Sequence, residues 1–328
     1  MRLDEPFQIG GVEIPNRVLL APLAGIGNWF VRLQARRHGA GMAFSEMVSS
    51  HALHHGNRRT LVEMLRTHPD EGPLALQLFG AEPNVMRSAA RIVSERTDAR
   101  IIDLNMGCPV PKVRKSGAGV ELLADQDLAV EVARAAGEGS GLPVTVKLRS
   151  GLEPGDTRGV TLAQRLVAEA GVAAIGFHPR SARVQHKGRA DYALARELVE
   201  SLDVPVVISG GMRGAERARE RWEESGAAAL MVARGGLGNP WIFSELLGAE
   251  VPEPGRARVV AELRWILDHA ERHWGEVRAA RNLRKFYPWY LERIGVGGAE
   301  AHAFQTTASV AEVEVLLDRL ERDVPVAV

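Results

Sequence analysis

The side chain in this sequence with the greatest intrinsic reactivity is Cys108, the only cysteine in 328 residues. It follows a short apolar run at 101–104 and lies in a turn that contains Gly107, Pro109 and Pro111. Such a run is typical of a buried strand, and glycine and proline typically end one. A lone cysteine is usually a small buried side chain. At the carboxyl end of a strand, however, Cys108 would face a cavity, so we interpret it as a chemically active thiol.

Two glycine-containing segments could bind a phosphate group. They are Ser209-Gly210-Gly211 and Ala233-Arg234-Gly235-Gly236, and each follows an apolar run. Backbone amides at the start of a helix bind phosphate well, and Arg234 would add a charged donor. A glycine pair taken alone would be better explained as a tight turn. Because Lys147 and Gln77 occupy equivalent positions near the ends of other runs, we favour a phosphorylated cofactor.

Lys147 and Gln77 also indicate what kind of cofactor this is. An ammonium group near the end of a buried strand is unfavourable unless it meets an anion. A flavin ring, which carries negative charge when it is reduced, would meet that need. The amide of Gln77 offers donors and an acceptor to the polar edge of such a ring.

A zinc site is the rival interpretation of His178, which also follows an apolar run. Zinc needs three or four ligands. His51, His54 and His55 belong to another loop, and no Asp or Glu at a suitable spacing completes a motif with them. We therefore expect no metal.

The apolar runs must be the elements that position these side chains. They predict eight strands, at 18–22, 42–45, 74–79, 100–105, 143–148, 172–177, 204–209 and 227–232. Helical patterns lie between them at about 27–38, 84–96, 126–137, 160–170, 191–201 and 214–224. Continuous apolar runs are typical of parallel strands buried on both faces. We predict an α/β fold, a (β/α)8 TIM barrel with its active site at the carboxyl ends of the strands. A doubly wound sheet is the alternative, but no Gly-x-Gly-x-x-Gly motif follows the first strand.

The composition changes near residue 249. The segment 251–255, Val-Pro-Glu-Pro-Gly, is typical of a linker. Beyond it, amphipathic helices are expected at about 256–274, 276–293 and 309–322. We therefore predict two domains, a barrel at 1–249 and a small helical bundle at 250–328.

The second of these predicted helices is basic. Its cations are three or four residues apart and would share one face, with no acid between them: Arg278, Arg281, Arg284 and Lys285. Contact with phosphate groups is one interpretation, and a solvated helix face is the other. A second basic segment lies near the predicted barrel mouth and comprises Arg180, Arg183, Lys187 and Arg189.

The overall composition limits the class of protein. Apolar residues make up 45% and charged residues 25%, the balance of an ordinary globular protein. The net charge is zero, so a nucleic acid would have to bind a local basic patch. One cysteine excludes a disulfide framework. The first ten residues do not have the pattern of a signal peptide, and no run reaches the roughly 18 apolar residues of a membrane span. We expect a cytoplasmic protein.

Together these segments resemble the tRNA-dihydrouridine synthases, along the barrel and into the helical domain. The catalytic loop of that family resembles Asn105-Met106-Gly107-Cys108-Pro109, followed by Lys112-Val113 and Gly117-Ala118-Gly119. Its flavin-contacting segments resemble Ala21-Pro22-Leu23-Ala24-Gly25, Gln77-Leu78-Phe79-Gly80 and Val146-Lys147-Leu148-Arg149. Its signature after the last strand resembles 234–243, and its basic, aromatic tRNA-contacting segment resembles 284–290.

The resemblance implies reduction of uridine in tRNA to 5,6-dihydrouridine by FMN, which is itself reduced by NADPH or NADH. Cys108 would be the general acid that protonates carbon 5 of the uracil, since a free thiol with a pKa of about 8.5 is mostly protonated near neutrality. The residues expected to bind the cofactor are Pro22, Leu23, Ala24, Gln77, Asn105, Lys147, His178, Ser209, Gly210, Gly211, Ala233 and Arg234. Those expected to contact tRNA are Lys112, Arg180, Arg183, Arg278, Arg281, Arg284 and Lys285. No protein partner is indicated, and we expect a monomer.

The sequence departs from the family pattern at several positions. Leu23 replaces a methionine under the flavin, and Phe286 replaces a frequent histidine in the RNA-binding segment. The segment 209–211, Ser-Gly-Gly, replaces Asn-Gly-Asp, so an acid near the flavin phosphate and ribose is absent. Pro179 stiffens the chain after His178. We expect altered FMN contacts rather than loss of FMN.

Two other functions account for part of the pattern. A flavin barrel acting on free pyrimidines, such as a relative of dihydroorotate dehydrogenase, would not need a basic helical domain. A non-catalytic RNA-binding protein without flavin would not need Cys108, Lys147, Gln77 or Arg234.

Overall fold

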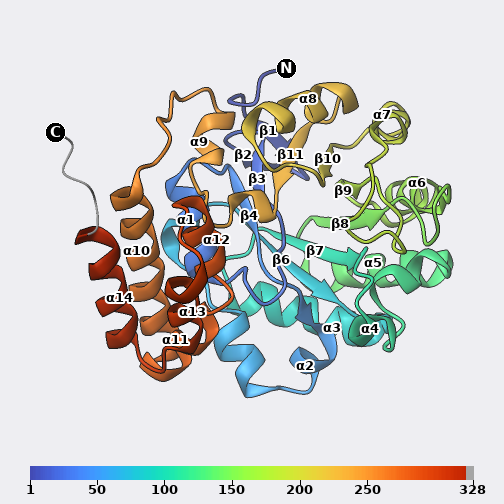
Figure 1. Cartoon of the computed structure of the whole chain (residues 1–328). Coiled ribbons are helices and arrows are strands. Elements are labelled where there is room, and N and C mark those ends of the chain that lie inside the picture. The colour runs from blue at the N-terminus through green and yellow to red at the C-terminus, as the bar shows by residue number, and fades with distance from the viewer. Residues whose placement is uncertain (323–328) are drawn as a thin grey trace.

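The computed structural model describes residues 1–322, and its central element is a closed parallel barrel (Figure 1). The barrel strands are β3 (Val18–Leu20), β4 (Met42–Phe44), β6 (Leu74–Phe79), β7 (Ile101–Met106), β8 (Val144–Arg149), β9 (Ala174–His178), β10 (Val206–Ser209) and β11 (Ala229–Val232). The short strand β5 (Val48–Ser49) pairs in parallel with the carboxyl end of β6. Pairing of β11 with β3 and of β4 with β6 closes the ring. All eight predicted strands are present, and the (β/α)8 barrel prediction is confirmed.

Helices surround the barrel, and all except the last, which follows β11, lie in the connections between strands. They are α1 (Trp29–Arg37), α2 (Ser50–His54), α3 (Pro83–Arg96), α4 (Pro111–Arg114), α5 (Gln126–Ser140), α6 (Arg158–Ala170), α7 (Tyr192–Glu200), α8 (Ala215–Ser225) and α9 (Ile242–Leu246). Short helical turns lie at η1 (Thr60–Met64), η2 (Pro69–Glu71), η3 (Gly119–Leu123) and η4 (Arg234–Gly236). The apolar faces of the long helices pack on the outer strand side chains in one large buried cluster.

A hairpin of β1 (Phe7–Ile9) and β2 (Val12–Ile14) precedes the barrel. Its apolar side chains share a buried cluster with the inward-facing residues Leu19, Met42 and Phe44. The hairpin therefore closes the end of the barrel interior opposite the strand carboxyl ends.

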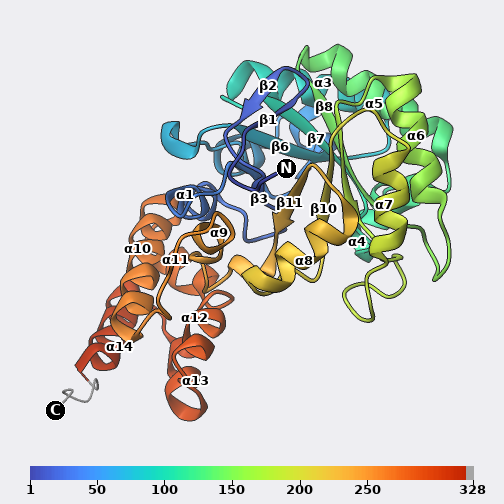
Figure 2. The same ribbon diagram turned by 90° about the horizontal axis from the view of Figure 1, so that it is seen from above.

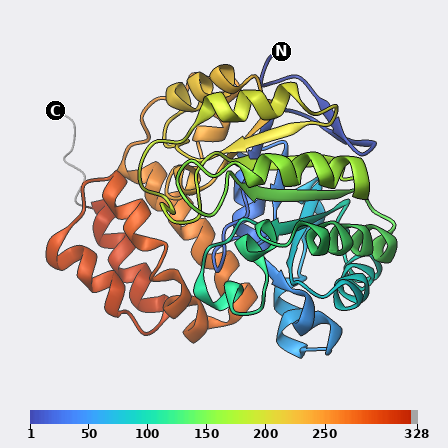
Figure 3. The ribbon, with the colours of Figure 1, turned by 90° about the vertical axis from the view of Figure 1, so that its right-hand side faces the viewer.

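The remaining helices lie together on one side of the barrel (Figures 2 and 3). They are α10 (Arg256–Trp274), α11 (Glu276–Leu283), α12 (Tyr287–Arg293), α13 (Gly298–Thr306) and α14 (Val310–Arg322). One apolar cluster extends from the barrel helices into this bundle. The division at residues 249 and 250 stays a prediction, and the end of the predicted domain, 323–328, lies outside the described residues.

The prediction of one helix at 276–293 is wrong. A turn at 284–286 separates α11 from α12. Pro288 lies in the first turn of α12, where its missing N–H costs nothing, and a proline disfavours helical backbone before it. The guanidinium of Arg284 donates to the Thr307 carbonyl at 2.7 Å, and this contact holds the turn against the segment after α13.

The bundle packs tightly against the barrel where α12 meets the segment after η4. Gly238 has a φ of +64°, and a Cβ there would lie 2.3 Å from the carbonyl oxygen of Trp289. Polar contacts support the same junction: Gln34 on α1 donates to Glu262 on α10 at 2.7 Å and accepts from Tyr290 at 3.0 Å. At position 238, only glycine allows the two backbones to come this close.

Candidate functional site

A cavity of about 390 Å³ opens at the carboxyl ends of the barrel strands. This volume is within the range of small-molecule sites. Every residue that the sequence predicts to bind the cofactor lines it, and so does Cys108: Pro22, Leu23, Ala24, Gln77, Asn105, Lys147, His178, Ser209, Gly210, Gly211, Ala233 and Arg234. Of the tRNA-contacting predictions, only Arg180 is in the lining.

Asn105 at the end of β7 holds the loop that carries Cys108. Its side-chain oxygen accepts from the backbone N–H of Cys108 at 2.9 Å and of Gly107 at 3.3 Å. Its amide nitrogen donates to Gln77 at 2.9 Å. The polar atoms of Asn105 are thus engaged within the protein, and they orient the turn that presents the partly buried thiol to the cavity.

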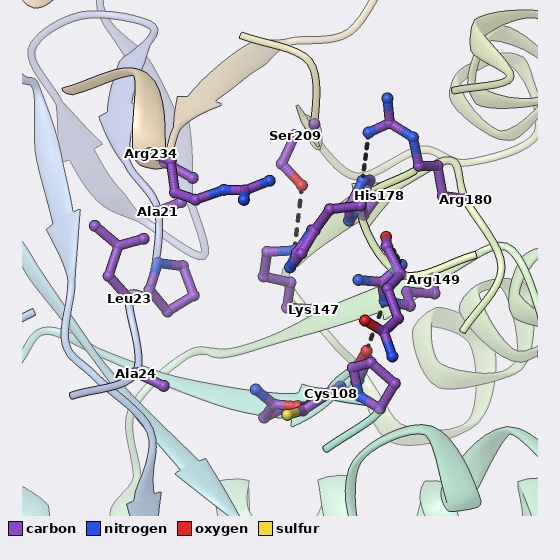
Figure 4. Close-up of a pocket in the computed structure, with 18 of the residues that line it drawn as sticks. Ala21, Leu23, Ala24, Cys108, Lys147, Arg149, His178, Arg180, Ser209 and Arg234 are labelled. Atoms are coloured by element: carbon purple, nitrogen blue, oxygen red, sulfur yellow. Dashed lines mark hydrogen bonds between the residues drawn. The ribbon is translucent and has the colours of Figure 1, made fainter. Parts of the chain in front are cut away.

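Lys147 lies on the cavity floor and reaches the end of β10. Its ammonium donates to the hydroxyl of Ser209 at 3.1 Å (Figure 4). Burial, and after it the neighbouring Arg149, lowers the pKa of Lys147 to about 8. An anion in the cavity would stabilise the charged form of this group.

His178 at the end of β9 is a neutral acceptor at physiological pH. Burial, and after it the cations around the cavity, holds the pKa of His178 well below its ordinary value. Its Nε2 lies 3.0 Å from a guanidinium nitrogen of Arg180 (Figure 4), so the unprotonated Nε2 accepts from Arg180. The ring also packs against Gly210, where a Cβ would lie 2.5 Å from it.

The glycine segment after β10 is surrounded by cations. Gly210 and Gly211 have φ values of +103° and +76°. Burial, and after it Arg213 and Arg180, lowers the pKa of Arg234. No carboxylate of the described residues belongs to the cavity lining, so these three guanidinium groups have no acidic partner inside it. Such an arrangement fits a phosphate group.

Apolar side chains form the facing wall of the cavity. Ala21, Leu23 and Ala24, which follow β3, lie opposite Lys147 and His178 (Figure 4). A planar ring system between an apolar wall and a row of polar groups would be held by both. The residues present therefore fit a flavin that carries a phosphate group.

Arg149 is a structural residue of the site that the predicted set omits. It is buried and donates to the Gly107 carbonyl at 2.9 Å, to the Ser181 carbonyl at 3.1 Å and to the Gln185 carbonyl at 2.8 Å. It therefore ties the cysteine loop to the loop after β9. Its position at the end of a predicted strand, two residues after Lys147, was a signal that could have identified it.

His186, Met47 and Arg213 also line the cavity, although the sequence analysis did not include them. Burial, and after it Arg234, lowers the pKa of His186 to about 4, so its ring is neutral. These residues lie in loops without regular secondary structure, so no spacing in the sequence predicts that they reach the cavity.

The four basic residues of 278–285 do not share one helix face, because the turn after α11 separates them. Arg278 is paired with Glu63 at 2.7 Å, and Arg284 is committed to the Thr307 carbonyl. Lys285 donates to the Gly25 carbonyl at the barrel mouth. Arg281 on α11 is exposed.

The other predicted tRNA contacts lie in loops around the cavity. Lys112 on α4 is exposed, and Arg183 is exposed and paired with Glu153 at 3.2 Å. Phe286, in contrast, is buried and packs near Phe30, with ring centroids 6.5 Å apart. The phenylalanine that departs from the family pattern therefore belongs to the junction of bundle and barrel.

Two further features concern the described residues only. Across 1–322, no cluster of three or more His, Cys, Asp or Glu side chains could hold a metal ion. Within the same range, no helix has both the length and the apolar character needed to cross a bilayer.

Comparison with known proteins identifies relatives over most of the chain. The sequence model of the family described as "Dihydrouridine synthase (Dus)" matches residues 19–327. A protein named tRNA-dihydrouridine synthase B from Pseudomonas aeruginosa is 36% identical over 295 residues, which cover 88% of this chain and 87% of that protein. A probable tRNA-dihydrouridine synthase from Mycobacterium tuberculosis is 34% identical over 338 residues, which cover 97% and 86%.

Solved structures share the fold at low sequence identity. An old yellow enzyme homologue from Zymomonas mobilis aligns with a TM-score of 0.53 at 14% identity, over 73% of this chain and 90% of that chain. A 2-naphthoyl-CoA reductase in complex with 2-naphthoyl-CoA aligns with a TM-score of 0.58 at 14% identity, over 75% and 52%. These likenesses support the barrel fold.

Proposed function

This chain belongs to the dihydrouridine synthase family, and from that premise we propose that it reduces uridines of tRNA to 5,6-dihydrouridine with FMN and NADPH or NADH. The observation that carries the proposal is a single cavity with two parts. The loop of Cys108 borders one part, and three guanidinium groups without an acidic partner border the other. A proton donor and a phosphate site across one cavity suit a nucleotide cofactor and a substrate that meet there.

The chain's own side chains would hold FMN by complementary charge and shape. The phosphate would bind at Arg180, Arg213 and Arg234 beside the backbone of Gly210 and Gly211. The ring system would lie on Ala21, Leu23 and Ala24, with Lys147 beneath the part that becomes negative. When bound, the flavin would supply the redox chemistry by carrying a hydride from the nicotinamide to carbon 6 of the uracil.

Cys108 would supply the proton that completes the reduction. Addition of a hydride to carbon 6 leaves an electron pair at carbon 5, and the Sγ–H of Cys108 would donate its proton there. The hydrogen bonds from Gly107 and Cys108 to Asn105 hold the backbone of the turn, so the thiol is directed into the cavity. The Arg149 contact to Gly107 holds the other side of the same turn.

The substrate would have to leave the stacked core of the tRNA to reach this cavity. Turning a base out costs roughly a few kcal/mol, which contacts to the RNA backbone can offset. Lys112, Arg183 and Arg281 are exposed on elements near or beside the cavity mouth and would supply such contacts. We further propose that the enzyme acts on tRNA as a monomer in the cytoplasm.

Two measurements test this function. The purified protein, incubated with FMN, is expected to show flavin absorbance that remains after gel filtration. In tRNA from cells that lack the protein, dihydrouridine is expected to be missing at one or more positions when it is mapped position by position. Protein that retains no FMN, or tRNA with every dihydrouridine intact, would contradict the proposal. Turnover of free uracil or dihydroorotate without tRNA would instead favour a free-pyrimidine enzyme.

A further inference from the structure

A fully buried carboxylate lies beneath the cysteine loop and has no role in the chemistry described above. Asp103 is in the middle of β7 and has 0% of its surface exposed. In the barrel register it lies directly between Gln77 on β6 and Thr145 on β8. A charge at such a position is costly unless it is fully hydrogen-bonded. Both neighbours satisfy it: Gln77 Nε2 and Thr145 Oγ1 each donate to Asp103 at 2.6 Å.

The contact with Gln77 determines which way the amide of that residue faces. A carboxylate only accepts hydrogen bonds, so the NH2 group of Gln77 must point at Asp103. The Gln77 oxygen then points the other way, where it accepts from Asn105 Nδ2 at 2.9 Å.

The same logic continues to the cysteine loop. Because Asn105 Nδ2 faces Gln77, its Oδ1 is turned toward the loop, where it accepts from the backbone N–H of Cys108 at 2.9 Å. With the amide of Asn105 reversed, a donor would face the N–H of Cys108 and the hydrogen bond would be lost. A row of donors and acceptors therefore runs without a break from Asp103 to Cys108.

We propose that Asp103 is a positioning residue: through Gln77 and Asn105 it fixes the orientation of the loop that presents the Cys108 thiol. The meaning of this role for catalysis rests on the proposed function, but the orientation of the loop does not. Thr145 contacts the same carboxylate and is not part of the path to Cys108. A substitution of Thr145 therefore disturbs the buried carboxylate without breaking the hydrogen bonds that lead from Asp103 to Cys108.

The test compares three substitutions: Asp103→Ala, Asp103→Asn and Thr145→Val. The readout is the second-order rate of Cys108 alkylation by iodoacetamide, measured at one pH in the purified protein with and without added FMN, alongside the urea midpoint of unfolding. Asp103→Ala is expected to change the alkylation rate by about fivefold or more, and Thr145→Val by less than about twofold. Both are expected to lose stability, because Asp103→Ala leaves the Gln77 and Thr145 donors without an acceptor and Thr145→Val removes one hydrogen bond of the carboxylate.

Asp103→Asn is expected to keep the wild-type alkylation rate. The asparagine oxygen can accept from Gln77 while its NH2 group donates to the Thr145 hydroxyl, so the direction of the row is kept. If Asp103→Ala does not fold, Gln77→Leu breaks the row one step later and is expected to give the same change in alkylation rate. Wild-type alkylation rates in both Asp103→Ala and Gln77→Leu would overturn the proposal. Equal changes of the rate in Asp103→Ala and Thr145→Val would overturn it as well.

A double-mutant cycle on tRNA reduction completes the test. If Asp103 acts through Asn105, Asp103→Ala lowers kcat in the wild-type background but changes it little further in an Asn105→Ala background. Independent, multiplicative losses would overturn the path. If wild-type protein does not reduce tRNA, the proposed function fails, while the alkylation rates still decide the role of Asp103.

Discussion

The thiol of Cys108 is oriented mainly by what holds its backbone. Asn105 accepts from two successive N–H groups of the turn, and Arg149 donates to the carbonyl of Gly107. The side chain itself is left free toward the cavity, as a group that transfers a proton must be. This separation predicts that the thiol can be removed without disturbing the pocket.

Cys108→Ala is therefore expected to bind FMN and accept electrons from NADPH as the wild type does. Turnover of tRNA should fall by about 100-fold or more, the usual contribution of a positioned general acid. Stopped-flow measurement of the two half-reactions separates these effects. A normal rate of dihydrouridine formation would reject the role of Cys108 as the acid. An equally slow reduction by NADPH would mean that the substitution has damaged the cofactor site.

Lys147 makes the affinity for reduced FMN, whose ring is anionic, depend on pH. In the free protein burial lowers the pKa of this group to about 8, and an anionic ring beside it would raise that pKa again. Below pH 8 the ammonium is already formed. Above it, binding must take up a proton, so the Kd for reduced FMN should rise by up to about tenfold per pH unit until the pKa of the complex is reached.

Anaerobic titration with chemically reduced FMN, followed by absorbance between about pH 7 and pH 9.5, measures this dependence. Lys147→Met removes the titrating group while keeping an apolar chain of similar length. Its Kd should be higher at pH 7 and nearly independent of pH over this range. A wild-type profile as flat as that of the variant would mean that Lys147 does not meet the negative charge of the cofactor.

At the scale of elements, the sequence predicted the barrel well because its strands are continuous apolar runs with helical segments between them. A parallel barrel brings all strand carboxyl ends to one mouth, so Gln77, Lys147 and Arg234 could be placed together from strand ends, while the full cofactor-binding set came from the family resemblance. The loops were not predictable in this way. Arg213 and His186 reach the cavity from irregular segments whose course depends on contacts such as Arg149 with Gln185.

The helices were harder where tertiary contacts decide their ends. The amphipathic pattern continues through 276–293, but Pro288 and the Arg284 contact to Thr307 break it into α11 and α12. The hairpin β1–β2 was missed although its signal is present: Gly10 and Gly11, both with positive φ, separate two short alternating segments.

Gly238 offers a test of the junction between barrel and bundle. Gly238→Ala would place a Cβ against the Trp289 carbonyl, at 2.3 Å in the present geometry, so α12 would have to move. Gly226→Ala is a matched control, because φ is +65° there and no atom lies within 4 Å of the added Cβ. We expect the control to cost about 1 kcal/mol in unfolding free energy and Gly238→Ala about 3 kcal/mol, measured by urea unfolding. Equal losses of unfolding free energy in the two variants would show that α12 can move away from the barrel without further cost.

At the scale of the whole molecule, the bundle reaches the loop that forms the apolar wall of the cavity. Lys285 donates to the carbonyl of Gly25, and the N–H of Gly25 donates to Glu46 at 2.8 Å. Burial raises the pKa of Glu46, and the charge of Lys285 opposes that rise. The position of the bundle and the shape of the cavity wall are thus linked through one residue. RNA bound on the bundle would therefore lie beside the cavity mouth.

The basic residues of the bundle differ in whether they are free to bind RNA. Arg278 is paired with Glu63, Arg284 with the Thr307 carbonyl, and Lys285 with the Gly25 carbonyl. Arg281 is exposed on α11 and is the member of this group best placed to contact phosphate. Arg281→Ala is therefore expected to weaken tRNA binding severalfold and to lower the slope of log K against log salt by about 1. FMN binding should not change, because Arg281 is not part of the cavity lining.

Filter binding of tRNA at several salt concentrations measures both the affinity and the slope. Arg96→Ala is the matched control: Arg96 is also exposed on a helix, but it ends α3, which runs away from the strand carboxyl ends. If tRNA lies across the bundle and the cavity mouth, only Arg281→Ala changes the salt slope. An equal change of the salt slope in both variants would indicate that positive side chains anywhere on the surface attract the tRNA. No change in Arg281→Ala would move the RNA path to the loops that carry Lys112 and Arg183.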